Sequence, residues 1–238
     1  MNSVEEKLNT LIAAYNKSVK GIDNAATMSK DRAYGGIIRA GKGKLVESLA
    51  SRLVQIAWVD VLHQSPSRME INKKKIPIYI KDDYIARISD PKVKDYVISH
   101  RDKLVYKFST DAQVFIDQRL VLPIECKAYT ENAMLKRILF DAALMKEAMG
   151  VNTYYIVQLE SQLGGDYSEL NDVTYGSPTT HVLLSHVDVE LKIITLLKGE
   201  RMVDRPIHKP EFFKELKMSE LEKAVELFAN DLKKYARG

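Results

Sequence analysis

A chain of 238 residues can bury one large core, and its 45% hydrophobic and 29% charged residues are typical of a soluble globular protein, which excludes intrinsic disorder. The one cysteine, Cys126, excludes an intrachain disulfide and a cysteine-based metal cluster, and we read it as a buried thiol. The net charge of +4 and pI near 8.9 suit a polyanionic partner without requiring one. No apolar signal segment or run of membrane length is present, so we predict a cytoplasmic protein without a membrane partner.

The N-terminal part of the chain changes character near residue 20. Apolar residues at helical spacing, among them Leu8, Leu11 and Tyr15, predict a first helix over residues 1–20. Residues 20–44 hold five glycines without the spacing of a phosphate-binding loop, and we predict a looser segment there. Its basic residues are Lys30, Arg32, Arg39, Lys42 and Lys44. The segment is either a solvated loop or a basic arm along a polyanion.

A long helix is predicted over residues 44–63, because apolar side chains recur on one face. Glu47 lies at the edge of that face, where it could pair with Lys44 or Arg52 about one turn away. Next come an edge strand over residues 76–80, a helix over residues 90–99 and a segment over residues 104–108 that leads into the central hairpin.

Residues 110–129 read as two β-strands joined by a polar turn at Asp117-Gln118-Arg119. If the turn holds those three residues, Asp111 lies directly opposite Glu125, ~4.5–5.5 Å away at Cα. Side chains alternate along a strand, so Lys127 projects to the same face as Glu125. Two opposed carboxylates repel each other, and a bound divalent cation with oxygen ligands would resolve the repulsion.

This constellation resembles the PD-(D/E)xK nuclease superfamily, and within it is most similar to type II restriction endonucleases. Asp111, Glu125 and Lys127 match the Asp, Glu and Lys of the motif, while Thr110 stands where the motif has proline. Glu47 resembles the additional acidic residue that many members carry on a helix before the catalytic strands. The alternative for Glu47 is an exposed glutamate on the helix surface.

A second Glu-x-Lys pair, Glu190 and Lys192, competes with Glu125 and Lys127 for the site. It lies in the alternating segment 187–193, which reads as a strand but lacks a preceding short hairpin. We therefore favour the pair in the hairpin.

The second half of the chain continues an alternating pattern of helices and strands. A helix is predicted over residues 132–149, ended by Gly150, and strands are predicted over residues 152–159, 181–186 and 193–197. Residues 164–180 form a long polar connection, of the kind that is usually functional or disordered. Residues 210–238 form one or two amphipathic helices.

The resemblance implies a single α/β nuclease domain over residues 1–238, with a mixed central sheet flanked by helices. It implies Mg²⁺-dependent, sequence-specific hydrolysis of double-stranded DNA to 5′-phosphate ends. Asp111 and Glu125 would hold the metal, Lys127 would orient the attacking water, and Glu47 would complete the catalytic set. The expected DNA contacts are Arg32, Arg39, Lys42 and Lys44 in the basic segment, and Tyr167, Asn171, Tyr175, Ser177, Thr179 and Thr180 in the polar connection.

A homodimer is expected, because a two-fold protein matches the two strands of a palindromic site. The apolar stripes of residues 1–20 and 210–238 are either dimerisation faces or intramolecular core. Two rival readings come from different classes: a structure-selective repair or junction-resolving nuclease on the same core, and a non-catalytic DNA-binding module with a degenerate site or a plain structural α/β protein.

Overall fold

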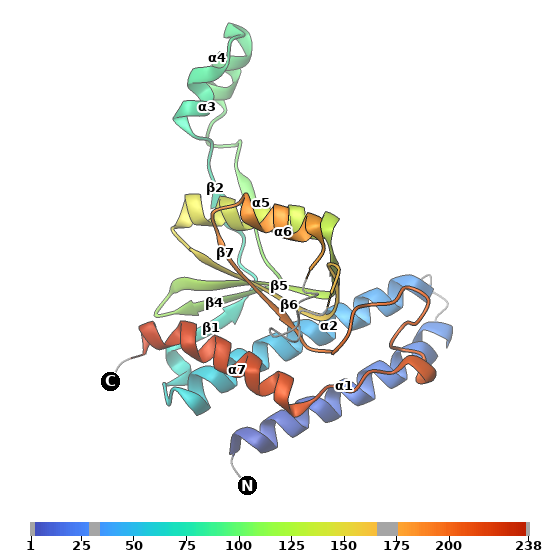
Figure 1. Ribbon diagram of the computed structural model, residues 1–238. Helices are drawn as coiled ribbons and strands as arrows, with labels where there is room; N and C mark the ends of the chain where they lie inside the picture. The colour runs from blue at the N-terminus through green and yellow to red at the C-terminus, as the bar shows by residue number, and fades with distance from the viewer. Residues whose placement is uncertain (1–2, 29–33, 166–175, 237–238) are drawn as a thin grey trace.

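The computed structural model describes residues 3–28, 34–165 and 176–236. Its centre is a five-stranded mixed sheet between two layers of helices (Figure 1). The strands, in spatial order, are β1 (Met69–Asn72), β4 (Ala112–Ile116), β5 (Arg119–Glu131), β6 (Thr153–Gln162) and β7 (Glu190–Thr195). The first three are antiparallel and the last three are parallel. The expected mixed sheet flanked by helices is present.

Three long helices cover one face of this sheet: α1 (Ser3–Met28), α2 (Tyr34–Gln55) and α7 (Met218–Leu232) (Figure 1). A π-helical turn (Ile56–Val61) continues α2, and short 3-10 turns stand at Pro66–Arg68, Pro210–Phe212 and Lys233–Tyr235. Leu8, Leu221 and Phe228 are at most 1% exposed. The two apolar stripes that could have been dimer faces are therefore part of the core.

The prediction of a loose segment over residues 20–44 was wrong. Helix α1 continues to Met28 because Val19, Ile22 and Ala26 extend its buried stripe, and α2 begins at Tyr34. The glycines misled the prediction, since glycine is a poor helix former in isolation. At Gly41 the glycine permits close packing of α1 on α2, because a Cβ there would lie 2.3 Å from Ile22 Cδ1.

Helices α5 (Asn132–Met149) and α6 (Pro178–Ser185) cover the other face of the sheet (Figure 1). Gly150 ends α5 in the left-handed conformation, at φ 66°, as predicted. The prediction of a strand over residues 181–186 was wrong. Ser177 caps α6 by accepting a hydrogen bond from the Thr180 amide, and Pro178 occupies the first turn, so the local start signal outweighs the β-forming side chains.

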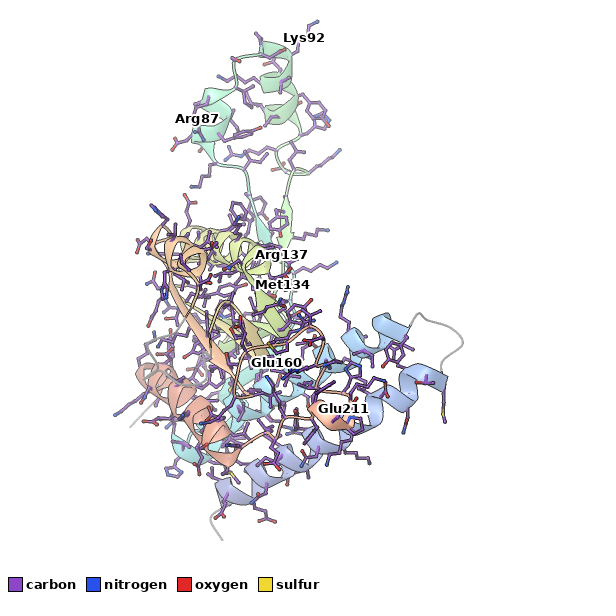
Figure 2. The ribbon with its side chains drawn as sticks, turned by 45° about the vertical axis from the view of Figure 1, so that its right-hand side comes forward. Arg87, Lys92, Met134, Arg137, Glu160 and Glu211 are labelled. Atoms are coloured by element: carbon purple, nitrogen blue, oxygen red, sulfur yellow. The ribbon has the colours of Figure 1, made fainter. Side chains whose placement is uncertain are left out.

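A projecting arm, residues 76–108, rises from the same face as α5 (Figure 1). It is a separate antiparallel ribbon of β2 (Ile76–Ile78) and β3 (Tyr106–Phe108) that carries α3 (Asp82–Arg87) and α4 (Pro91–Ser99). Figure 2 shows Arg87 and Lys92 at its far end. The arm exposes several large apolar side chains: Tyr79, Tyr84, Val93, Tyr96, Ile98 and Tyr106. None of the described helices has the length and apolar character needed to cross a membrane.

Candidate active site

The β4–β5 hairpin turns more tightly than the sequence analysis expected. Ile116 pairs with Arg119, so the turn holds two residues, Asp117 and Gln118, and not three. Both have positive φ, at 46° and 67°, which is the backbone of the hairpin turn that matches the twist of paired strands. Arg68 fixes the turn through an ion pair to Asp117, with Nη2 2.7 Å from Oδ2.

A β-bulge compensates for the shorter turn, so that the two strands beyond it are paired as predicted. The register shifts by one residue on β5, where Val121 is the extra residue, and Ala112 pairs with Ile124 beyond it. One residue further along this register Asp111 stands opposite Glu125. The predicted opposition of the two carboxylates is therefore present, although the predicted turn was wrong.

Lys127 bridges the two carboxylates. Its Nζ lies 2.7 Å from Asp111 Oδ2 and also donates a hydrogen bond to Glu125 Oε2. The Cys126 amide donates a second hydrogen bond to Asp111 Oδ2, at 2.9 Å. The Tyr154 hydroxyl lies 3.5 Å from the other oxygen of Glu125. Three of the four residues predicted to form the catalytic set thus meet at one end of the hairpin.

Burial sets the electrostatics of this cluster. Glu125 is 7% exposed, and burial raises its pKa above the ordinary value, with the charge of Asp111 adding to the rise and Lys127 opposing it. Burial also opposes ionisation of Asp111, but the hydrogen bond and charge of Lys127 keep the pKa of Asp111 below its ordinary value. For Lys127, burial is outweighed by the two carboxylates, which raise its pKa. The result is a buried site in which two carboxylates already hold one cation, the ammonium group of Lys127.

The donor set fits a hard divalent cation. Mg²⁺ is usually bound by one or two carboxylates, with water and substrate oxygens completing its shell. Across the described ranges, no group of three or more His, Cys, Asp or Glu side chains is placed to enclose a metal ion. The two carboxylates of Asp111 and Glu125 are the protein ligands that such a shell takes, with its other positions left to water and phosphate oxygens.

Glu47 lies apart from this cluster in the structure. Its Oε2 is 2.7 Å from Lys73 Nζ, so its partner is neither Lys44 nor Arg52. Burial raises the pKa of the Cys126 thiol, and the charges of Asp111 and Glu47 add to that rise. In the structure Glu47 is thus held in an ion pair with Lys73 and makes none of the contacts of the cluster.

The competing pair, Glu190 and Lys192, ties β7 to helix α7. Lys192 Nζ lies 2.7 Å from Asp231 Oδ1 and 3.2 Å from Glu190 Oε1. The Glu190 side chain is 55% exposed and accepts a hydrogen bond from Thr153, which lowers its pKa, in contrast to the raised pKa of buried Glu125. This geometry favours a structural role for the pair.

The ten residues predicted to contact DNA have three different fates. Four lie outside the described residues: Arg32, Tyr167, Asn171 and Tyr175. Arg39, Lys44 and Thr179 are exposed, as a DNA contact requires. Lys42 and Thr180 are buried, which contradicts a surface contact, and the side chain of the partly exposed Ser177 is engaged in hydrogen bonds within the protein.

The surroundings of these three side chains differ. Lys42 is 9% exposed because its face of α2 turns inward, where burial lowers its pKa and the charge of Glu160 opposes that change. Thr180 is fully buried and donates a hydrogen bond to the Leu163 carbonyl at 2.6 Å. The Ser177 side chain is the helix cap described above.

Sequence reasoning missed one polar residue beside the cluster. Gln158 pairs with Lys127 in the register of β5 and β6 and is fully buried. The signal that could have revealed it is a glutamine inside a strand of buried β-forming residues, Thr153–Gln162.

The chain is similar in sequence to a known enzyme. No protein-family model matches it. A solved structure, the native BbvCI A2B2 tetramer at low resolution, has a TM-score of 0.37 and 12% identity, covering 96% of this chain and 89% of its own, a likeness too low to support an argument. The type II restriction enzyme DdeI of Desulfomicrobium norvegicum is 47% identical over 227 residues, which cover 94% of this chain and 95% of that enzyme. The chain therefore belongs to the family of type II restriction enzymes.

Proposed function

We propose that this protein is a Mg²⁺-dependent, sequence-specific endonuclease that cleaves double-stranded DNA at an active site of the PD-(D/E)xK type. Family membership gives the reaction class, a type II site-specific deoxyribonuclease. The observation that supports the site is the contact of Lys127 with two converging carboxylates, Asp111 and Glu125, at the end of the β4–β5 hairpin.

Each residue of the cluster has a role that its position supports. Asp111 and Glu125 would hold the cation, which when bound polarises phosphate oxygens and lowers the pKa of water. Lys127 would donate a hydrogen bond to the attacking water and stabilise negative charge as it develops on the phosphate. The burial of Glu125 strengthens these interactions, because charges interact more strongly away from bulk water. Glu47 would join the site only by giving up its ion pair with Lys73.

Duplex DNA bound at this cluster would run beside the base of the arm. Strand β3 ends three residues before Asp111, and Phe108 anchors it in the core under α5. Lys107, the middle residue of β3, is exposed and has no ion pair among the described residues. We include it with Arg39, Lys44 and Thr179 as a proposed contact to DNA.

Replacing Lys107 with glutamine is expected to weaken DNA binding and its salt dependence. Loss of one phosphate contact lowers the slope of log affinity against log salt by about 0.9. The measurement is fluorescence anisotropy of a labelled duplex at several salt concentrations, with Ca²⁺ in place of Mg²⁺. Lys17→Gln is the matched control, since it removes the same charge from an exposed position on α1. Equal slopes for wild type and Lys107→Gln would remove Lys107 from the interface.

We further propose that the enzyme acts as a homodimer on a palindromic site. One cluster of Asp111, Glu125 and Lys127 per chain can serve one phosphate, whereas a duplex has two antiparallel strands. Because the stripes of α1 and α7 are buried, the interface would use another surface.

The expected result is a dimer in sedimentation of the protein with duplex and Ca²⁺, and discrete linear fragments from supercoiled DNA with Mg²⁺. A monomer that produces only nicked circles would contradict the dimer. A smear of fragments would favour the repair nuclease, and unchanged DNA would favour the non-catalytic binding module.

A further inference from the structure

Gln158 carries a buried hydrogen-bond acceptor that nothing in the described structure satisfies. Its side chain is fully buried on β6. The amide nitrogen donates to Thr195 Oγ1 on β7, at 2.9 Å. The amide oxygen, Oε1, has no partner among the described residues. Buried polar groups are almost always hydrogen-bonded, so an unpaired one calls for an explanation.

The sheet places this acceptor beside Lys127. Lys127 on β5 is directly paired with Gln158 on β6, and paired strands lie about 4.8 Å apart with matched residues on one face. Asp111, from the β4 side, holds Lys127 in the structure described here. Lys127 therefore uses an acceptor on the β4 side, Asp111, while the residue paired with it on β6, Gln158, has an acceptor that is not used.

Cation binding at the two carboxylates would displace Lys127. Asp111 Oδ2 already accepts hydrogen bonds from Lys127 Nζ and from the Cys126 amide, and Glu125 Oε2 also accepts from Lys127. These are oxygens that a divalent cation needs, and two positive charges do not share them without strong repulsion. The Lys127 side chain is only 18% exposed, so the displaced ammonium needs another acceptor within the protein.

We propose that Gln158 is a positioning residue, whose Oε1 accepts a hydrogen bond from Lys127 Nζ when a divalent cation occupies Asp111 and Glu125. Thr195 holds the amide nitrogen, so the oxygen remains available to Lys127. The row of Lys127, Gln158 and Thr195 across three strands then keeps the ammonium beside the reacting phosphate. This inference rests on the proposed function of the cluster.

A double-mutant cycle on metal binding tests the inference without measuring cleavage. Ca²⁺ is titrated calorimetrically into the DNA-free protein as wild type, Gln158→Met, Lys127→Met and the double variant. Gln158→Met is expected to weaken Ca²⁺ binding about tenfold when Lys127 is present, and less than about twofold when it is methionine, because the displaced ammonium is then absent. Equal effects in both backgrounds, or no effect in either, would overturn the inference.

Two further variants make the cycle specific. Gln113→Met is the matched control: Gln113 is equally buried with an unpaired amide, but it pairs with Pro123 and not with Lys127, so it should not couple to Lys127. If Gln158→Met does not fold, Thr195→Val takes its place in the cycle, because it releases the amide that Thr195 holds. Asp111→Asn separates the two hypotheses: if it leaves Ca²⁺ affinity unchanged, the proposed site itself fails.

Discussion

Replacing Lys127 with alanine is expected to lower the rate of DNA cleavage by about 10³-fold or more and to leave DNA affinity nearly unchanged. Loss of one preorganised group that stabilises developing charge costs about 10²–10³ in rate, and the loss of the group that orients the water adds to it. Binding is spared because affinity for DNA comes chiefly from many phosphate contacts. The measurement is single-turnover cleavage of a duplex that contains a cleavage site first mapped with the wild-type protein. Affinity for the same duplex is measured with Ca²⁺ in place of Mg²⁺.

The fold should tolerate this change. Lys127 projects from the face of β5 opposite to that of Ile124 and Cys126, which pack in the core with α2. A melting temperature close to that of wild type would confirm that the rate reports on chemistry. Cleavage by Lys127→Ala at the wild-type rate would contradict the proposed role.

Replacing Glu125 with glutamine is expected to change protein stability in opposite directions with and without a divalent cation. In the metal-free protein, burial and Asp111 raise the pKa of Glu125, so ionised Glu125 destabilises the fold. The stabilisation that protonated Glu125 contributes is complete at pH values below its pKa in the unfolded chain, and it is lost as the pH rises through its pKa in the folded protein. Glu125→Gln should therefore melt at a higher temperature than wild type at neutral pH and should lack this part of the pH dependence.

With the cation, the order should reverse. A ligand that binds only the folded state adds about 2.7 kcal/mol at a concentration 100 times its dissociation constant, and Glu125→Gln should lose most of this gain. Thermal unfolding at several pH values, with and without Ca²⁺, checks both halves. If the melting temperatures of wild type and Glu125→Gln change in the same way with pH and with Ca²⁺, the proposed role of Glu125 is contradicted. The same measurement tests whether Glu47 takes part in metal binding. If Ca²⁺ raises the melting temperature of Glu47→Ala as much as that of wild type, Glu47 has no role in the metal site and serves only as the partner of Lys73.

The alternation of side chains predicted the cluster well, because period two decides which residues share a face whatever the turn. Glu125 and Lys127 follow from that rule alone. The position of Asp111 needed the register, which depends on a two-residue turn and the bulge at Val121. The expected three-residue turn leads to the same register as the two-residue turn and the bulge together. The pairing of Asp111 with Glu125 was therefore predicted correctly from an incorrect turn.

Other elements were predicted wrongly, either because a tertiary contact decides them or because a local start signal was overlooked. Gly41 looks like a loop residue until Ile22 is seen to pack against it. The run after Pro178 contains β-forming residues, yet the Ser177 cap begins a helix that packs beside α5. The projecting arm has little core of its own, with only Ile85 and Val97 buried in its two helices, so no strong periodic pattern marks α3.

The claim that Asp111, Glu125 and Lys127 form the active site is tested most directly by comparing two matched variants, Glu125→Gln and Glu190→Gln. Each removes one carboxylate charge from a Glu-x-Lys pair whose lysine also contacts a second carboxylate, Asp111 in one case and Asp231 in the other. Cleavage of supercoiled DNA with Mg²⁺ is measured for both under identical conditions. We expect no detectable cleavage by Glu125→Gln and the wild-type rate for Glu190→Gln. Wild-type cleavage by Glu125→Gln together with its loss in Glu190→Gln would place the active site on β7 and contradict the account.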